Sequence, residues 1–266
     1  MDHRKIEWLF LILFLLVDIY LFVELWQAPV TLTSSTTSTT STANLKSEMK
    51  SDNITLPKLS KQSGSGYYLA SKNKSDLKEK TKTLSSDLTT SYSDSDNILY
   101  GTLKTPIALE RMTVKNFKND TNYVLHSKDY VYDSSLSSSS TYVYLQKTKF
   151  GTLYSGAGQL VINVKDKAIT GYYQTYLNDL TSVRELQATI SPWRAVTNLY
   201  TTRELTSNSK VMWVKPAYTR LTKVKGNVIF VPTWLVLIEN KRSKSTALKR
   251  INAFSGQLMQ TNAINE

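Results

Sequence analysis

Residues 159–177 read QLVINVKDKAITGYYQTYL, and this stretch predicts the element around which the rest of the chain is arranged. Apolar and polar residues alternate on both sides of Lys165-Asp166-Lys167, a pattern typical of two half-buried strands. A short polar segment between two such runs favours a tight turn. The stretch therefore predicts an antiparallel β-hairpin over 159–164 and 169–177.

Downstream of the hairpin, one helix and further strands are predicted. Ser191 and Pro192 suit the N-cap and first turn of a helix, and the apolar spacing of Val196, Leu199 and Tyr200 gives that helix one buried face. The predicted strands that follow are 211–214, 229–238 and 248–254. The order ββαβββ predicts an α+β domain over 151–266, in which an antiparallel sheet carries a helix on one face.

Upstream of the hairpin, a first α+β subdomain, related to the second, is predicted over 66–150. Tyrosine- and valine-rich runs suit strands, because aromatic and β-branched side chains fit a pleated surface. These runs are Tyr67–Ala70, Tyr123–Leu125, Tyr130–Tyr132 and Tyr142–Leu145. A helix capped by Ser75 would hold Leu77, Leu84 and Leu88 on one side.

The segment before these subdomains, 27–65, is predicted to be a flexible linker. It contains TLTSSTTSTTSTANLKS at 31–47 and few large apolar side chains, so it cannot bury enough surface to offset the loss of chain entropy. Such a tether lets a folded domain stand away from its attachment point.

Residues 6–26, IEWLFLILFLLVDIYLFVELW, predict a transmembrane helix about 30 Å long. Arg4 and Lys5 lie in the tail 1–5, and no further Lys or Arg occurs before Lys46, so the N-terminus is expected in the cytoplasm and the rest outside the cell membrane. A cleaved signal peptide is the alternative. It is disfavoured because the run exceeds an apolar region of roughly 7–15 residues and contains acidic residues.

Asp18 is the unusual residue of this predicted helix, because a carboxylate within the apolar layer costs at least ~2.5–3.5 kcal/mol. It is expected either to face a partner helix or to reach water near the outer boundary. On the first interpretation, one helical turn in each direction marks a contact face formed by Phe14, Leu15, Asp18, Leu21 and Phe22.

Composition favours binding over catalysis. The chain has no cysteine and two histidines, which excludes disulfides, thiolate metal sites and multi-histidine metal sites. No nucleophile motif surrounds its serines, and His126 has no evident catalytic partner. No cofactor is expected. Trp193, Trp213 and Trp234 are expected in the core, and the alternative is that some of them contact a partner protein.

The formal net charge of +12 raises the question of anionic partners. Nucleic acid would be considered for a cytoplasmic protein, but the predicted topology places the basic part outside the membrane. Two interpretations remain, which are attraction to anionic lipid or wall polymer and a solvated lysine-rich surface.

The chain resembles the YycI regulatory proteins of low-GC Gram-positive bacteria. The resemblance is carried by the basic N-terminus with one helix, GYYQTYL at 171–177, the A-x-x-x-L-Y of 195–200, PTW at 232–234 and INAFSG at 251–256. The family-motif positions are Tyr173, Gln174, Tyr176, Leu199, Tyr200, Pro232, Trp234, Asn252, Ala253 and Gly256.

This resemblance implies an accessory protein of an essential cell-wall sensor histidine kinase. It also implies contacts with the kinase through transmembrane helices and a heterodimer with a related single-pass protein, YycH. Two other hypotheses stay open, a binding module for anionic wall polymer and, more weakly, an anchored hydrolase.

Overall fold

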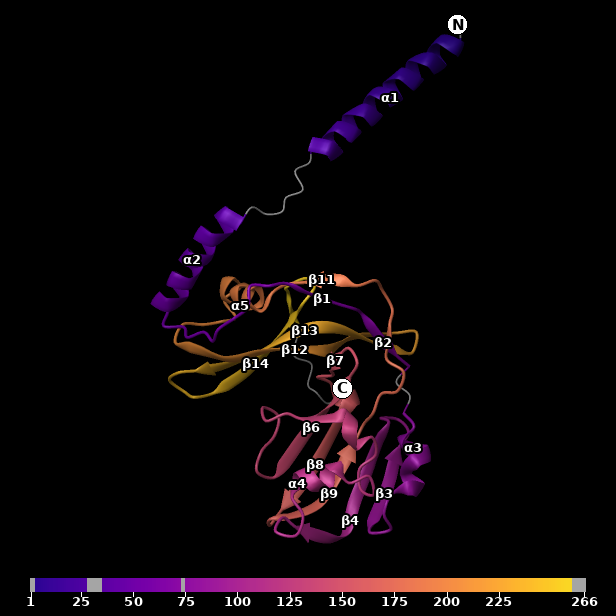
Figure 1. Cartoon of the computed structure of the whole chain (residues 1–266), viewed down its shortest axis with the longest axis vertical. Helices are drawn as coiled ribbons and strands as arrows, with labels where there is room; N and C mark the ends of the chain where they lie inside the picture. Colours follow the sequence, from indigo (N-terminus) through magenta and orange to yellow (C-terminus); the bar gives the residue numbers. More distant parts are fainter. Residues whose placement is uncertain (1–2, 28–34, 73–74, 260–266) are drawn as a thin grey trace. The chain divides into compact units, whose positions relative to one another are not determined.

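A computed structural model describes residues 3–27, 35–72 and 75–259, which fall into the units Met1–Ser51 and Asp52–Glu266. The first unit contains α1 (His3–Gln27) and α2 (Ser35–Ser51) (Figure 1). Among the described residues, no helix meets the length and hydropathy needed to cross a membrane. The predicted transmembrane span over 6–26 is therefore not confirmed and stays a prediction.

The prediction of a wholly flexible linker over 27–65 is wrong in two places. Residues Ser35–Ser51 form α2, whose second half contains the good helix formers Ala43, Leu45 and Lys46. The second compact unit begins at Asp52, well before the predicted start at residue 66, because Thr55 donates a backbone hydrogen bond to Ser209 and strand β1 (Gly64–Gly66) pairs with β11 (Gln187–Thr189).

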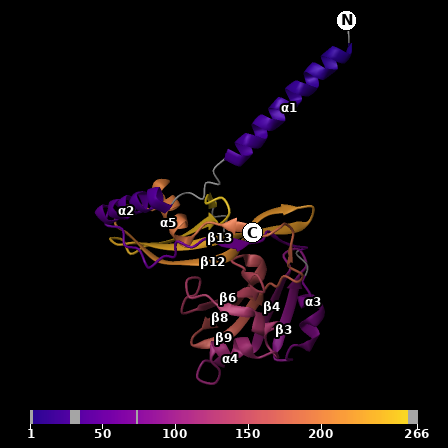
Figure 2. The same cartoon turned by 45° about the horizontal axis from the view of Figure 1, so that its top comes forward.

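The second unit is α+β and its sheets are mostly antiparallel, which confirms the predicted fold class at this level. One sheet of seven described strands has the order β3-β4-β9-β8-β6-β5, and β7 pairs with β6 (Figure 2). Its strands are β3 (Leu88–Ser93), β4 (Ile98–Ala108), β5 (Tyr130–Tyr132), β6 (Thr141–Thr148), β7 (Gly151–Thr152), β8 (Gln159–Lys165) and β9 (Ala168–Gln174).

The predicted hairpin is present as β8 and β9, joined by a two-residue turn. Asp166 and Lys167 have φ values of 52° and 59°, as a turn of type I′ requires, and Lys165 pairs with Ala168. This hairpin joins strands from the first half of the chain, because β9 pairs with β4 and β8 with β6. The predicted subdomain boundary at residue 150 therefore does not coincide with a boundary between sheets.

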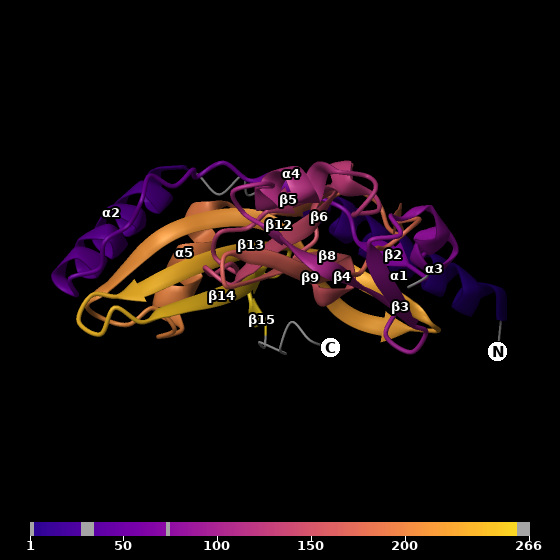
Figure 3. The ribbon, with the colours of Figure 1, turned by 90° about the horizontal axis from the view of Figure 1, so that it is seen from below.

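The other large sheet contains six described strands in the order β10-β2-β13-β14-β15, with β12 paired to β13 (Figure 3). Its strands are β2 (Leu69–Ser71), β10 (Thr181–Ser182), β12 (Ser209–Val224), β13 (Asn227–Asn240), β14 (Thr246–Asn252) and β15 (Leu258–Met259). Helix α5 (Pro192–Thr201) begins as predicted, because the Ser191 side chain accepts a hydrogen bond from the Arg194 N–H.

The two faces of the seven-stranded sheet have different partners. On one face, Tyr144, Leu160 and Tyr172 pack with Phe117 of α4 (Val114–Asn119). The residues that alternate with them, Val143, Leu145 and Val161, pack with Ala217 and Leu235 of the second sheet. The sheet is therefore the middle layer of the second unit, and α4 covers one end of its outer face. Trp193, Trp213 and Trp234 are half-buried, and Trp213 packs against the cluster between the two sheets, so their predicted place in the core is confirmed only in part.

Two local predictions in the first half are wrong. The helix after Ser75 is the single turn α3 (Leu77–Lys80), and Leu88 instead begins β3, where it pairs with Leu103. Residues 123–125 are not a strand, because the Tyr123 and Val124 N–H groups both bond to the Asp120 carbonyl, which continues the turn after α4.

Candidate functional site

The residues predicted to contact a partner in the membrane lie on α1. Phe14, Leu15 and Asp18 are exposed, whereas the side chains of Leu21 and Phe22 lie outside the described residues. The described large apolar side chains between Trp8 and Tyr20 are 48% to 70% exposed, so the helix presents an apolar surface on all sides. The contact of this surface with a partner helix stays a prediction.

The family-motif residues at the end of the hairpin have structural partners. Gln174 is fully buried, and its Nε2 donates to the Leu125 carbonyl at 2.6 Å and to the Tyr130 hydroxyl at 3.2 Å. The Tyr176 hydroxyl donates to Asp129 Oδ2 at 2.8 Å. Tyr173 packs on the opposite face, beside the cluster that contacts the second sheet.

The remaining motif residues connect α5 to β13 and β14. Trp234 Nε1 donates to the Ile190 carbonyl at 2.9 Å, and the Ala253 N–H bonds to the carbonyl of Pro232. Asn252 Oδ1 caps the turn that follows β14, and the Tyr200 hydroxyl donates to Asp52 Oδ2 at 2.8 Å. Two of these motif residues, the buried Leu199 and Gly256, line a small pocket of about 310 Å³ beside α5.

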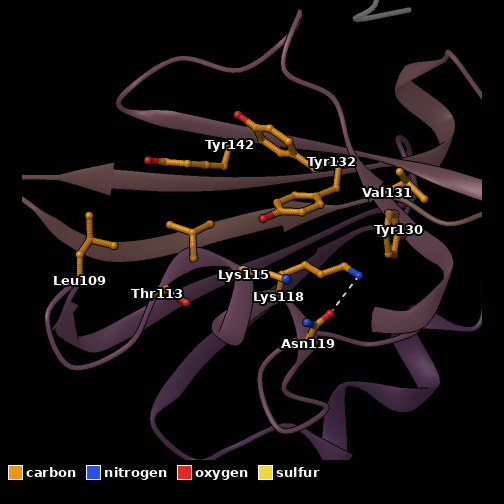
Figure 4. Close-up of a pocket in the computed structure, with 11 residues that line it drawn as sticks. Leu109, Thr113, Lys115, Lys118, Asn119, Tyr130, Val131, Tyr132 and Tyr142 are labelled. Atoms are coloured by element: carbon orange, nitrogen blue, oxygen red, sulfur yellow. Dashed lines mark hydrogen bonds between the residues drawn. The ribbon is translucent and has the colours of Figure 1, made fainter.

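A larger pocket lies elsewhere, between α4 and the strands β5 and β6 (Figure 4). Its volume is about 670 Å³, within the range of roughly 300–1,000 Å³ typical of ligand sites. Four tyrosines contribute to its lining, and we call it the tyrosine pocket. The lining residues are Leu109, Thr113, Val114, Lys115, Lys118, Asn119, Tyr130, Val131, Tyr132, Tyr142 and Tyr144.

Local sequence explains how these side chains converge. The Thr113 side chain accepts a hydrogen bond from the Asn116 N–H and starts α4, which orients Val114 and Lys118 toward the sheet. Tyr132 lies opposite Tyr144 in the β5–β6 pair, which puts both rings on the face that α4 covers. The predicted strands at 130–132 and 142–145 are confirmed.

The tyrosine rings form a connected aromatic wall. The centroid of the Tyr132 ring lies 5.4 Å from that of Tyr144 and 6.3 Å from that of Tyr142. Burial raises the pKa of Tyr144 to about 12, so its hydroxyl stays protonated at neutral pH. Tyr130 closes the inner end, where its hydroxyl donates to the Thr175 carbonyl at 2.5 Å.

Lys118 supplies a cation to the lining of this pocket, and Figure 4 shows its hydrogen bond to Asn119 as a dashed line. The residue is only 7% exposed. Its Nζ donates to Asn119 Oδ1 at 3.2 Å and lies 5.8 Å from the centroid of the Tyr144 ring. Burial lowers the pKa of this amine, and the nearby charge of Asp129 offsets the change in part.

The lining of the tyrosine pocket contains two lysines and no carboxylate. The arrangement can hold an anion next to an apolar group, by charge at Lys118 and by contact with the rings. Within the described ranges, no group of three histidine, aspartate or glutamate side chains is placed to hold a metal. The predicted absence of enzymatic activity stays a prediction.

Sequence reasoning identified the strands of this site but missed Lys118 and the pocket. The signal available was weak: Lys118 follows Phe117 in a six-residue helix, where a lysine is ordinarily a solvated residue. His126 was also missed as a partnered residue, because Asp76, whose Oδ1 lies 2.8 Å from its Nε2, is far away in the sequence.

Comparison with known proteins gives one match to a protein family. The family described as YycI protein matches residues 32–254. No curated protein matches the chain. Several solved structures resemble it, including the following two. An uncharacterized protein from Eubacterium rectale is 10% identical, with a TM-score of 0.42 over 76% of this chain and 86% of its own. The Bacillus megaterium YpeB C-terminal domain is 16% identical, with a TM-score of 0.37 over 65% of this chain and 83% of its own.

Proposed function

Because the chain belongs to the YycI family, we propose that it is a membrane-anchored accessory regulator of a cell-wall sensor histidine kinase. In this proposal residues 6–26 span the cell membrane with the N-terminus in the cytoplasm. The unit Asp52–Glu266 lies outside the cell and binds other proteins. Family membership is consistent with a regulatory role in a two-component system.

The exposed apolar surface of α1 is the observation that supports the proposed membrane anchor. Its described large apolar side chains from Trp8 to Tyr20 are all at least 48% exposed, and such a helix is stable only in lipid or against other helices. Asp18 lies among them and is also exposed. A carboxylate there favours a polar partner on a neighbouring helix, and we propose the kinase as that partner.

The proposed second partner is a YycH-type paralogue that binds the external unit. Tyrosine-rich edges such as β5 support this proposal, because tyrosine is common where proteins bind tightly. Tagged full-length chain purified from native membranes should retain both the kinase and the paralogue. Recovery of the chain with neither protein would contradict the proposal.

The role of the helix is tested by replacing residues 6–26 with an unrelated apolar helix of equal length. Membrane fractionation should show unchanged localisation, while a reporter of kinase output should change because the polar contact is lost. Asp18→Leu should reproduce part of that change. If the replaced helix regulates as well as the native one, signalling does not depend on the helix surface.

A matched control moves the carboxylate to the other side of the helix. Asp18→Leu combined with Leu16→Asp keeps the charge and the composition, but the carboxylate points about 200° away around the axis. This double variant should not restore kinase output. Restoration would mean that a carboxylate at this depth matters and its face does not.

A further inference from the structure

We propose that the tyrosine pocket binds a peptide segment of a partner protein in which a carboxylate follows an aromatic or aliphatic side chain. The inference rests on the proposed function, in that the chain acts by binding proteins. It adds the place on the external unit where a partner segment is held and the chemistry that selects it.

Charge complementarity selects the carboxylate. Lys118 Nζ lies in a largely apolar pocket with the amide oxygen of Asn119 and the face of Tyr144 as its neighbours. No carboxylate of the described residues lies within ion-pair distance of this amine. An incoming carboxylate would form an ion pair with this amine in addition to the more distant charge of Asp129, and a buried charge-assisted hydrogen bond is stronger than one in water. Lys115, exposed on the same helix, adds positive charge at the mouth.

The aromatic wall selects the apolar side chain. Tyr132, Tyr142 and Tyr144 present connected ring surfaces, and Leu109 and Val114 add aliphatic side chains to the lining. Aromatic pairs with centroids separated by about 4.5–7 Å are attractive beyond the area they bury, so an incoming aromatic ring gains contact with several tyrosines at once. The volume of about 670 Å³ suits a short peptide.

The sheet edge beside the pocket favours an extended peptide over a sugar or phosphate polymer. Strand β5 ends the seven-stranded sheet, and among the described strands only β6 pairs with it. Val131 and Tyr132 of β5 are 45% and 48% exposed. An edge strand can accept an added strand by main-chain hydrogen bonds. A repeating anionic polymer would instead need a row of cations along an open groove.

The experiment uses full-length chain in detergent micelles, with tyrosines replaced by 3-fluorotyrosine and followed by 19F NMR. Single Tyr→Phe variants assign the signals of Tyr132, Tyr142 and Tyr144. The probes are Ac-Leu-Phe-Glu-NH2, its uncharged analogue Ac-Leu-Phe-Gln-NH2, and poly(glycerol phosphate). The acidic peptide should shift the pocket signals and bind at least about tenfold more tightly than the amide, the effect of one charge-assisted hydrogen bond.

Variants separate the two parts of the proposal. Lys118→Met should make the two peptides bind equally, whereas the matched change Lys115→Met on the exposed side of α4 should keep most of the preference. Tyr132→Ala, at a half-exposed position that does not threaten folding, should weaken both peptides about tenfold. Unchanged signals from tyrosines outside the pocket show that each variant is folded.

Four results would overturn the proposal. Equal binding of the acidic and amide peptides would remove the role of Lys118, and so would a preference that survives Lys118→Met. Shifts caused only by poly(glycerol phosphate) would assign the pocket to a wall polymer, and no shift with any probe at about 10 mM would leave it without a peptide role. Peptide binding is measured without the kinase, so these results are independent of the helix-replacement experiment.

Discussion

The imidazole of His126 lies flat against the phenol ring of Tyr176, with ring centroids 3.9 Å apart and planes inclined by 4°. His126 has φ of 50°, in the left-handed region, and its Nε2 lies 2.8 Å from Asp76 Oδ1. Tyr176 in turn donates from its hydroxyl to Asp129. This stack ties the segment before α3 to the turn before β5 and to the end of β9.

Asp76 should make the fold sensitive to acid. Burial alone would raise the pKa of Asp76, but hydrogen bonds from Lys80 and His126 outweigh it and lower the pKa below the ordinary 3.8. The contribution of a group with a lowered pKa is present above its unfolded value and is lost as pH falls through its folded value. Asp76→Asn should therefore cost about 1 kcal/mol at neutral pH and reduce the loss of stability below about pH 3.8.

Asp94→Asn is the matched control for Asp76→Asn. Asp94 also pairs with a lysine of α3, Lys78, but both side chains are more than half exposed. Removing this pair should change stability by well under 1 kcal/mol. Denaturant titration of full-length chain at several pH values measures both variants, and equal effects would mean that the partly buried contact with His126 adds nothing.

Residue 101 must be glycine because the ring of Tyr172 on the neighbouring strand leaves no room for a Cβ atom. The two residues are paired between β4 and β9, and a Cβ at residue 101 would lie 2.5 Å from Cε1 of Tyr172. Gly101→Ala should therefore cost about 1–3 kcal/mol, the usual effect of overpacking a core. Tyr172→Phe is the control: it removes a buried hydroxyl that has no hydrogen-bond partner among the described residues, so stability should be unchanged or higher. A tolerated Gly101→Ala would mean that the strands can shift.

Elements with strong local signals could be predicted from the sequence. Alternation and a polar turn predict β8 and β9, and Ser191 with Pro192 predicts the start of α5. The partners of these elements could not be predicted, because strand pairing is decided by packing between distant residues. Nothing within Gln159–Lys165 indicates that its neighbour is Thr141–Leu145 and not a later strand. Leu88 shows the same limit, since its pairing with Leu103 overrides a helical spacing.

The candidate site was predictable only in its strands. Tyrosine-rich runs indicate β5 and β6. The pocket also needs residues of α4, and a helix of six residues leaves little periodicity to detect in the sequence. Motif residues such as Gln174 and Trp234 are important for the structure and are not part of the candidate site. The Gln174 Nε2 and the Trp234 Nε1 donate inside the fold, to the carbonyls of Leu125 and Ile190.

Trp234 should stabilise the contact between β13 and the segment that leads into α5. Its Nε1 donates to the Ile190 carbonyl at 2.9 Å, so Trp234→Phe keeps most of the apolar contact and removes this hydrogen bond. The expected cost is about 1–2 kcal/mol, because the carbonyl loses its partner. Trp213→Phe is the control, since Trp213 is half-buried beside Lys215 and its ring N–H makes no hydrogen bond within the described chain. Urea denaturation compares the two, and equal costs would mean that ring size alone matters.

The charged amine of the buried Lys118 should destabilise the fold at neutral pH. Burial lowers its folded pKa below the ordinary 10.5, so the charged amine opposes folding at neutral pH and this penalty disappears as pH rises from the folded toward the unfolded value. Lys118→Met keeps the length of the apolar stem and removes the charge, and it should stabilise the fold by roughly 0.5–2 kcal/mol at pH 7. The exposed Lys115→Met should change stability by less than about 0.5 kcal/mol.

Denaturation of full-length chain at pH 7 and pH 10 should show that the stabilisation by Lys118→Met is smaller at the higher pH. If the Lys118→Met variant is less stable than the native chain, the amine is a structural donor to Asn119. The proposal that Lys118 binds an anion in the tyrosine pocket would then lose its support.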